Sequence, residues 1–165
     1  MAKASGKGDA TKKVIDLLNE GRARELGAIL QYMAHHYELE DSDFGKLAKV
    51  LKETGIVEMK HAEKLAERIL FLGGEPTSRL EPQPKKGQTI PQMLATDEAL
   101  EAGAVRLYND SAGRCAELGD QISKELFEEL LADEEEHLDT FQNIAAHVKQ
   151  LGGAYLATLT GGEAE

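Results

Sequence analysis

Two short segments of the chain repeat the pattern Glu-x-x-His, with Glu58 and His61 in one and Glu134 and His137 in the other. On an α-helix, residues three positions apart lie on the same face, so each segment directs a carboxylate and an imidazole to one point. Such a pair can bind a metal ion. Two pairs on facing helices could hold two metal ions, provided that other helices supply further carboxylates.

The number of matches alone is weak support for a metal site. With five histidines in a glutamate-rich chain, composition predicts roughly two-thirds of one Glu-x-x-His match by chance. The position of each match within the apolar pattern of its helix must therefore decide.

The helices that carry these segments follow from the distribution of prolines and apolar residues. All four prolines fall between Gly73 and Thr96, which predicts one long connection there. Helical periodicity predicts helices over residues 11–39, 44–72, 97–118 and 121–151, with a short fifth helix over 154–159. The acidic turn 40–43 is expected to cap the second helix. The predicted fold is all-α, a four-helix bundle whose long crossover between helices 2 and 3 lets those two helices run in parallel.

Polar residues interrupt the apolar stripe of every long helix. They are Glu25 in the first helix, Glu58 and His61 in the second, Glu101 in the third, and Glu134 and His137 in the fourth. Burying four carboxylates would cost several kcal/mol each unless cations balance them, and two divalent ions would cancel their charge. The alternative is a set of ordinary salt bridges on solvated faces.

We therefore predict a site for two ions of iron or manganese, which suit oxygen ligands combined with imidazole. In this prediction Glu58 and Glu134 each serve one ion together with the neighbouring histidine. Glu25 and Glu101 then complete or bridge the two sites.

Length and composition limit the other classes of function. The 165 residues suit one domain over residues 11–159, with a flexible N-terminal arm at 1–10 and a polar tail at 160–165. The net charge of −11 argues against nucleic acid, and no uncharged apolar run is long enough for a membrane span. The single Cys115 excludes a disulfide within the chain and is expected in the core. With no signal-peptide pattern at the start, a cytoplasmic protein is expected.

The chain resembles the bacterioferritins over residues 13–159. The resemblance lies in Arg24-Glu25-Leu26 with Gln31-Tyr32, in residues 58–63 (EMKHAE) and 66–72 (AERILFL), and in residues 133–137 (DEEEH). It implies a ferritin-like fold, and it implies that the ligands of a ferroxidase centre with two iron ions per subunit are Glu25, Glu58, His61, Glu101, Glu134 and His137. The implied reaction is oxidation of Fe(II) by O2 or H2O2, followed by storage of the mineral in a hollow shell. Tyr32 becomes a candidate redox tyrosine, although a plain core tyrosine is the equal alternative.

Met59 lies about 100° around the helix from Glu58 and so cannot share the stripe that faces the metals. Its neighbours on that side, Gly55, Ala62 and Ala66, are small and leave room for a flat group. By resemblance, Met59 would be an axial ligand of a b-type haem, or a related iron porphyrin, shared between two subunits. The alternative is a methionine that packs across a dimer contact.

The resemblance also implies a homo-oligomeric shell of about twenty-four subunits built from twofold dimers, and a ferredoxin-type reductant that releases the iron. One departure concerns an extra iron site on the inner wall of some members. That site uses histidine and aspartate where this chain has Glu53 and Val57, so the resemblance does not extend it to this chain.

Three other functions remain open. One is a different ferritin-like di-iron or di-manganese peroxidase, of the rubrerythrin or manganese catalase type. The single cysteine excludes only a fused rubredoxin site, which needs four thiolates. Another is a DNA-protecting miniferritin, although those proteins usually build the iron site between subunits. The last is a helical interaction module without metal.

Overall fold

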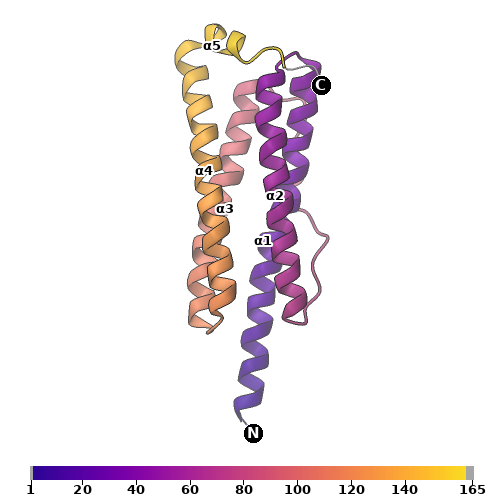
Figure 1. Ribbon diagram of the computed structural model, residues 1–165, viewed down its shortest axis with the longest axis vertical. Coiled ribbons are helices and arrows are strands. Elements are labelled where there is room, and N and C mark those ends of the chain that lie inside the picture. The colour runs from indigo at the N-terminus through magenta and orange to yellow at the C-terminus, as the bar shows by residue number, and fades with distance from the viewer. Residues whose placement is uncertain (1, 163–165) are drawn as a thin grey trace.

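The computed structural model describes residues 2–162, and this part of the chain is helical without strands (Figure 1). The five helices are α1 (Ala2–Asp41), α2 (Gly45–Phe71), α3 (Ile90–Glu117), α4 (Gln121–Leu151) and α5 (Gly153–Thr158). The all-α prediction is confirmed. Met1 of the predicted arm and residues 163–165 of the predicted tail lie outside the described residues. No helix in residues 2–162 is both long and apolar enough to cross a membrane.

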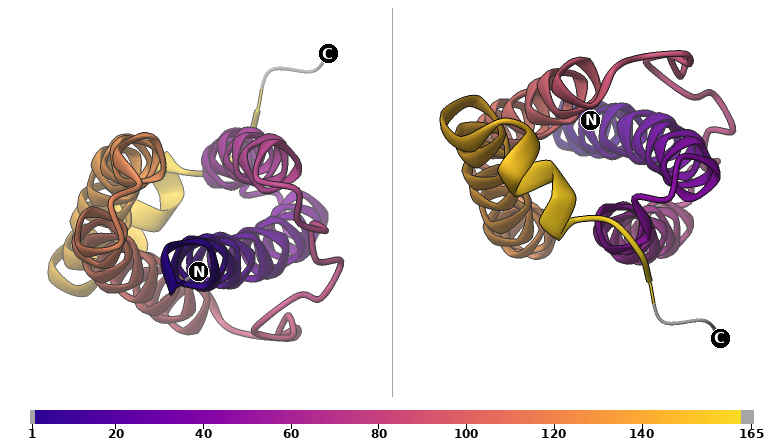
Figure 2. Two further views of the ribbon diagram at one scale, coloured as in Figure 1. Left: turned by 90° about the horizontal axis from the view of Figure 1, so that it is seen from below. Right: turned by 90° about the horizontal axis from the view of Figure 1, so that it is seen from above.

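The four long helices form two antiparallel hairpins, α1 with α2 and α3 with α4, which pack side by side (Figures 1 and 2). The crossover between α2 and α3 runs along the outside of the bundle, so these two helices point the same way. The predicted bundle topology is therefore correct. α5 lies across one end, where Tyr155, Leu156 and Leu159 pack against the core.

Two helices begin earlier than the sequence predicted. α1 begins at Ala2 and not at residue 11, in a segment rich in alanine and lysine, which favour helix without any apolar periodicity. α3 begins at Ile90 and not at residue 97. Pro91 stands in its first turn, where a missing N–H removes no helical hydrogen bond. Thr89 and Gln92 form a capping box there, so the connection ends at Thr89.

The acidic turn does not cap α2, contrary to the prediction. The residue before α2 is Phe44, and no side chain bonds to the first backbone N–H groups of that helix. The Ser42 hydroxyl instead donates to the carbonyl of Glu38, in the last turn of α1. Asp43 adopts a left-handed conformation with φ of 63°. The turn therefore closes α1.

Hydrogen bonds fasten the crossover to α1 along its length. The Glu81 N–H donates to the Ala23 carbonyl at 2.9 Å, and Arg22 Nε donates to the Thr77 carbonyl at 3.0 Å. An added Cβ at Gly27 would lie 2.6 Å from the Glu81 carbonyl, so only glycine permits this close approach. The crossover and α1 thus form one wall of the bundle.

The apolar core is divided into two clusters. One contains Leu18, Leu65, Tyr108, Cys115 and Phe127, which confirms Cys115 as a core residue. The other contains Tyr32, Leu47, Leu94, Phe141 and Val148. A layer of buried polar side chains lies between the clusters, at the middle of the four long helices.

Candidate metal centre

The six residues that interrupt the apolar stripes come together in this middle layer. Glu25, Glu58, His61, Glu101 and Glu134 are at most 3% exposed, and the side chain of His137 is 14% exposed. They form two groups of possible metal ligands, and the atoms of each group lie within 4.8 Å of one another. The groups are Glu25, Glu58, His61 and Glu134 on one side, and Glu58, Glu101, Glu134 and His137 on the other. We call the whole set the carboxylate centre.

Glu58 and Glu134 belong to both groups because each directs one oxygen to each histidine. Glu58 Oε2 lies 2.9 Å from His61 Nδ1, and its Oε1 lies 2.9 Å from His137 Nδ1. Glu134 Oε1 lies 3.1 Å from His61 Nδ1, and its Oε2 lies 3.5 Å from His137 Nδ1. The geometry of a bridging pair therefore belongs to Glu58 and Glu134, whereas the sequence analysis left open whether Glu25 and Glu101 complete or bridge the two sites.

Glu25 and Glu101 each belong to one group and are held by a tyrosine from another helix. The Tyr108 hydroxyl donates to Glu25 Oε1, and the Tyr32 hydroxyl donates to Glu101 Oε1. Both tyrosines are fully buried. Their rings pack against phenylalanines at 5.6 Å between centroids, Tyr32 on Phe141 and Tyr108 on Phe127. The tyrosines therefore join the carboxylate centre to the two apolar clusters.

The two hairpins contribute equivalent halves of the centre. The same offset of 76 positions relates Glu25 to Glu101, Tyr32 to Tyr108, Glu58 to Glu134, and His61 to His137. The sequence analysis gave Tyr108 no role in the site. The constant offset is the signal that could have identified it, since Tyr108 is the counterpart of the candidate Tyr32.

The equivalence of the two hairpins does not extend to the residue that contacts His61 on the side away from the carboxylates. His61 Nε2 donates to Asp133 Oδ2 at 3.0 Å, a contact that fixes the ring with Nδ1 towards the carboxylates. The position related to Asp133 by the offset is Val57, whose apolar side chain cannot bond to His137. The two halves of the centre therefore differ in how firmly their imidazoles are held.

Burial raises the pKa values of the outer carboxylates, whereas hydrogen bonds with the histidines lower that of Glu134. Burial, with the negative charges of Glu58 and Glu134, raises the pKa of Glu25 well above its ordinary value. Burial and the charge of Glu58 likewise raise the pKa of Glu101. Burial acts to raise the pKa of Glu134 as well, but hydrogen bonds with His137 and His61 outweigh it and lower the pKa to about 2.

The histidines hold their protons in the absence of metal. Burial acts to lower the pKa of His137, but its interactions with Glu134 and Glu58 raise it to about 10. Contacts with Glu134 and Glu25 likewise outweigh burial and raise the pKa of His61. The centre thus gathers negative charge that either protons or metal ions can balance.

The donor atoms fit a pair of metal ions. Both oxygens of Glu58 and Nδ1 of His137 are buried, and none of them makes a well-aligned hydrogen bond within residues 2–162, although Oε1 and Nδ1 approach to 2.9 Å as an ion pair. Buried polar atoms usually have well-formed partners, which a metal ion between these atoms would supply. Carboxylate oxygens with imidazole nitrogens suit iron or manganese.

Met59 lies about 100° around α2 from Glu58 and is 55% exposed, and Ile56, three positions earlier, is 40% exposed. Two of the small residues beside it pack inside the bundle of the single chain. Gly55 and Ala62 are buried, and the space at Gly55 is occupied by the Met33 methyl, 2.9 Å from where a Cβ would stand. The exposed feature is therefore the Met59 thioether itself.

Comparison with known proteins finds similar sequences along most of the chain. The family model for the ferritin-like domain matches residues 15–151. The bacterioferritin of Desulfovibrio desulfuricans is 43% identical over 96% of this chain and 88% of its own length. The bacterioferritin of Rhodobacter capsulatus is 42% identical over 93% of this chain and 94% of its own length.

Solved structures of the same two proteins resemble this one. A structure of the D. desulfuricans bacterioferritin, described as showing its diiron site in different catalytic states, has a TM-score of 0.92 at 42% identity and covers 96% of each chain. The R. capsulatus structure has a TM-score of 0.87 at 39% identity and covers 93% of this chain and 98% of that one. It is described as having a metal-free dinuclear site, with haem iron in a crystallographic special position.

Proposed function

The chain belongs to the bacterioferritins, and on that premise we propose that it stores iron after oxidising Fe(II) at the carboxylate centre. The oxidant is O2 or H2O2. The six proposed ligands are Glu25, Glu58, His61, Glu101, Glu134 and His137.

The observation that carries this proposal is the sharing of Glu58 and Glu134 between two ligand groups. Carboxylates with one oxygen on each side can hold two ions next to each other. Two Fe(II) ions bound together supply two electrons, which suffice to reduce one H2O2 to two water molecules with the uptake of two protons. A site for a single ion would not supply both electrons at once.

The surrounding residues prepare the ligands for this reaction. Glu25 and Glu101, with raised pKa values, release their protons when two dications enter, because metal binding favours the ionised carboxylate. The protons on Nδ1 of His61 and His137 must leave as well. The hydroxyls of the two tyrosines keep the outer carboxylates oriented. Both remain hydrogen-bond donors, because burial raises their pKa values.

All six proposed ligands come from one chain. This supports a bacterioferritin-type centre over a miniferritin site built between subunits.

Iron titration tests the proposed reaction. Apoprotein that receives Fe(II) under air should show a rise in near-ultraviolet absorption with a break near two irons per chain. Glu134→Ala removes a shared ligand and should abolish the break. Glu135→Ala is the matched control, because its exposed side chain is one residue away on the same helix. Absence of any optical change near two irons would exclude ferroxidase activity.

Met59 supports a second part of the proposal, a haem held between two copies of the chain with one thioether from each. A thioether is a known haem ligand, and this one is exposed on the single chain. Met59→Leu should remove the haem Soret band from the purified protein, whereas Met33→Leu should leave it in place. A Soret band that is unaltered in Met59→Leu would exclude this residue as the ligand.

The shell is the last part of the proposal. We expect a homo-oligomer of about twenty-four chains built from twofold dimers, and a ferredoxin-type protein as the reductant for release. Native mass spectrometry should give the mass of this particle. A stable monomer in solution would contradict storage within a shell.

A further inference from the structure

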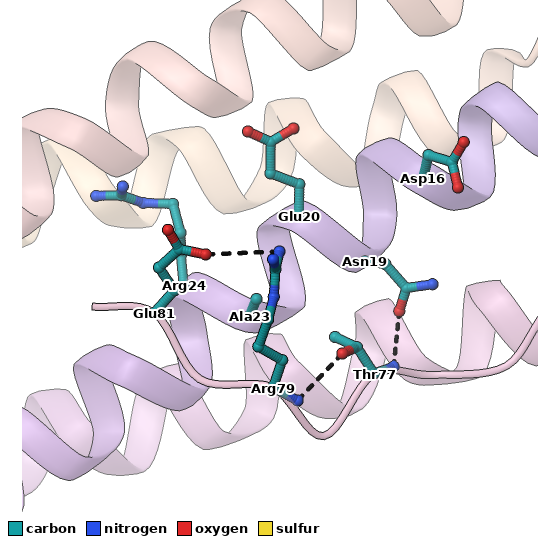
Figure 3. A pocket seen from close by; sticks show the side chains of 8 residues that line it. All are labelled: Asp16, Asn19, Glu20, Ala23, Arg24, Thr77, Arg79 and Glu81. Carbon is teal, nitrogen blue, oxygen red and sulfur yellow. Dashed lines mark hydrogen bonds and ion pairs between the residues drawn. The ribbon is translucent and has the colours of Figure 1, made fainter. Parts of the chain in front are cut away.

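Three hollows meet at one side chain, Arg24 of α1. An outer pocket of about 480 Å³ lies between α1 and the crossover, with Asp16, Glu20 and Glu81 around it (Figure 3). A second pocket of about 600 Å³ lies further along α1, towards α3. The third is an inner cavity of about 10 Å³, room for about one water molecule.

The inner cavity is part of the carboxylate centre. Arg24 lines it together with Glu25, Tyr32, Glu101 and Glu134. The same arginine therefore lines both outer pockets and the cavity that reaches the proposed ligands. It stands where an opening from the outer face would join the centre.

Arg24 closes this opening by reaching from α1 across to α3. Its Nη2 donates to the Leu100 carbonyl at 3.0 Å. A Cβ added at Gly103 would lie 2.2 Å from Nη2, so the guanidinium occupies the space that the missing side chain leaves. Figure 3 shows the guanidinium extending away from the Arg79 and Glu81 pair.

The contacts that hold Arg24 in this position are few. Its Nε is buried and has no hydrogen-bond partner within residues 2–162. An unpaired buried donor is unfavourable, so the closed position gives up part of the stability of a fully bonded guanidinium. Glu20 lies four residues earlier on the same helix and lines the outer pocket, a spacing that favours an ion pair with Arg24 turned outward. A second position is thus available to the side chain.

The charge on Arg24 opposes the passage of cations while it is closed. A guanidinium is always protonated in proteins, and here it lies between the acidic outer pocket and the buried carboxylates. A dication that enters from the outer pocket would have to pass this fixed positive charge at short range. Outward rotation would remove the steric block above the inner cavity and pair the positive charge with the Glu20 carboxylate.

We propose that Arg24 is a gate through which Fe(II) passes from the outer pocket to the carboxylate centre. The gate is closed when the guanidinium lies on the Leu100 carbonyl above Gly103, and it is open when the side chain turns into the outer pocket. The identity of the ion rests on the proposed function, whereas the gate itself rests on the position of Arg24.

The test uses Co(II), which binds without being oxidised and is followed by its visible absorption in a stopped-flow instrument. Arg24→Ala should bind two Co(II) per chain about tenfold faster than wild type, the factor expected when one hydrogen bond to a charged group no longer holds the gate closed. Gly103→Ala keeps the charge but displaces the guanidinium, so it should also accelerate binding without changing the stoichiometry.

Arg79→Ala is the matched control. It removes the same charge from the same outer pocket, but Arg79 is 65% exposed and paired with Glu81, and its rate should stay within about twofold of wild type. Equal rates in wild type, Arg24→Ala and Gly103→Ala would overturn the gate, and so would equal acceleration by Arg24→Ala and Arg79→Ala. Wild-type protein that binds no Co(II), or binding that survives loss of both Glu58 and Glu134, would instead overturn the proposed function.

Discussion

Asp133 forms a hydrogen bond with His61 on the side of the ring away from the other carboxylates. The His61 Nε2 lies 3.0 Å from Asp133 Oδ2, while its Nδ1 faces Glu58. For the counterpart His137, the position equivalent to Asp133 by the 76-residue offset is Val57, which cannot make this contact. Contacts of this kind orient a metal-binding imidazole and raise its basicity. The two halves of the centre should therefore differ in metal affinity.

Asp133→Ala should weaken one of the two metal sites by about tenfold and leave the other nearly unchanged. The loss falls on the His61 half, because only that imidazole loses its anchor. Isothermal titration of the apoprotein with Co(II) would resolve the two sites. Asp139→Ala, an exposed change on the same helix, serves as the control. Equal weakening of both sites would show that Asp133 acts through charge alone.

Tyr32→Phe and Tyr108→Phe should slow Fe(II) oxidation to a similar extent. Each change leaves a buried carboxylate without its hydroxyl donor, at a cost of about 1.5–3 kcal/mol for a bond to a charged group. The check is the initial rate of iron oxidation with two Fe(II) per chain, together with the number of irons bound. A loss of rate confined to Tyr32→Phe, with normal binding, would favour the redox role of Tyr32 over positioning.

Bound metal should stabilise the fold, because it binds the folded site and not the unfolded chain. At a free ion concentration a hundred times the dissociation constant, the gain is about 2.7 kcal/mol for each ion bound. Thermal unfolding with chelator and with Co(II) measures it. Glu25→Gln should keep or raise the stability of the apoprotein and reduce the gain from metal, since Glu25 has a raised pKa. The exposed Glu63→Gln should behave as wild type, and an equal gain in Glu25→Gln would contradict the ligand role of Glu25.

The apoprotein should also show a pH dependence that originates at Asp97, outside the centre. Burial raises the pKa of Asp97 from 3.8 to about 6, against the opposing effect of His35. The folded protein holds this proton more tightly than the unfolded chain. The stability that it contributes is therefore complete below pH 3.8 and is lost as the pH rises through about 6.

Asp97→Asn removes this titration. The difference in unfolding free energy between wild type and Asp97→Asn should change by about 2 kcal/mol between pH 4 and pH 7, with wild type losing relative stability as the pH rises. Chemical denaturation of the apoprotein at several pH values measures the difference. A difference that stays constant with pH would place the titrating group elsewhere.

The sequence predicted the bundle and brought the six residues to one layer, because apolar periodicity identifies which positions of a helix face inward. The same signal could not locate the start of α3, since Pro91 suggests a break when its place in the first turn is unknown. The sequence also could not show which carboxylates are shared between the two ligand groups. Whether Glu58 or Glu25 lies between the two groups depends on the spacing of the helices and on side-chain rotamers, which periodicity does not encode. The ligand roles themselves stay a prediction.

Local sequence patterns did not reveal several of the contacts found in the structure. The acidic turn has the composition of a helix cap, yet it closes α1 because Phe44 stands before α2. Among the small residues around Met59, Gly55 packs against the Met33 methyl of the neighbouring helix, a contact that the spacing of small residues did not indicate. Arg24 belongs to one of the motifs that carry the resemblance, but no sequence pattern gave it a role, since its contact above Gly103 joins two helices far apart in the sequence.

The polar layer between the two apolar clusters has a consequence for the cooperativity of unfolding. Each cluster draws on both hairpins, so each can act as a separate folding unit, coupled to the other through the layer that contains the carboxylates. Without metal, this coupling rests on the hydrogen bonds and ion pairs within the layer, and we expect that one end of the bundle can open while the other persists. On the proposed set of ligands, two bound ions would cross-link all four long helices at their centre and turn the pair of units into one.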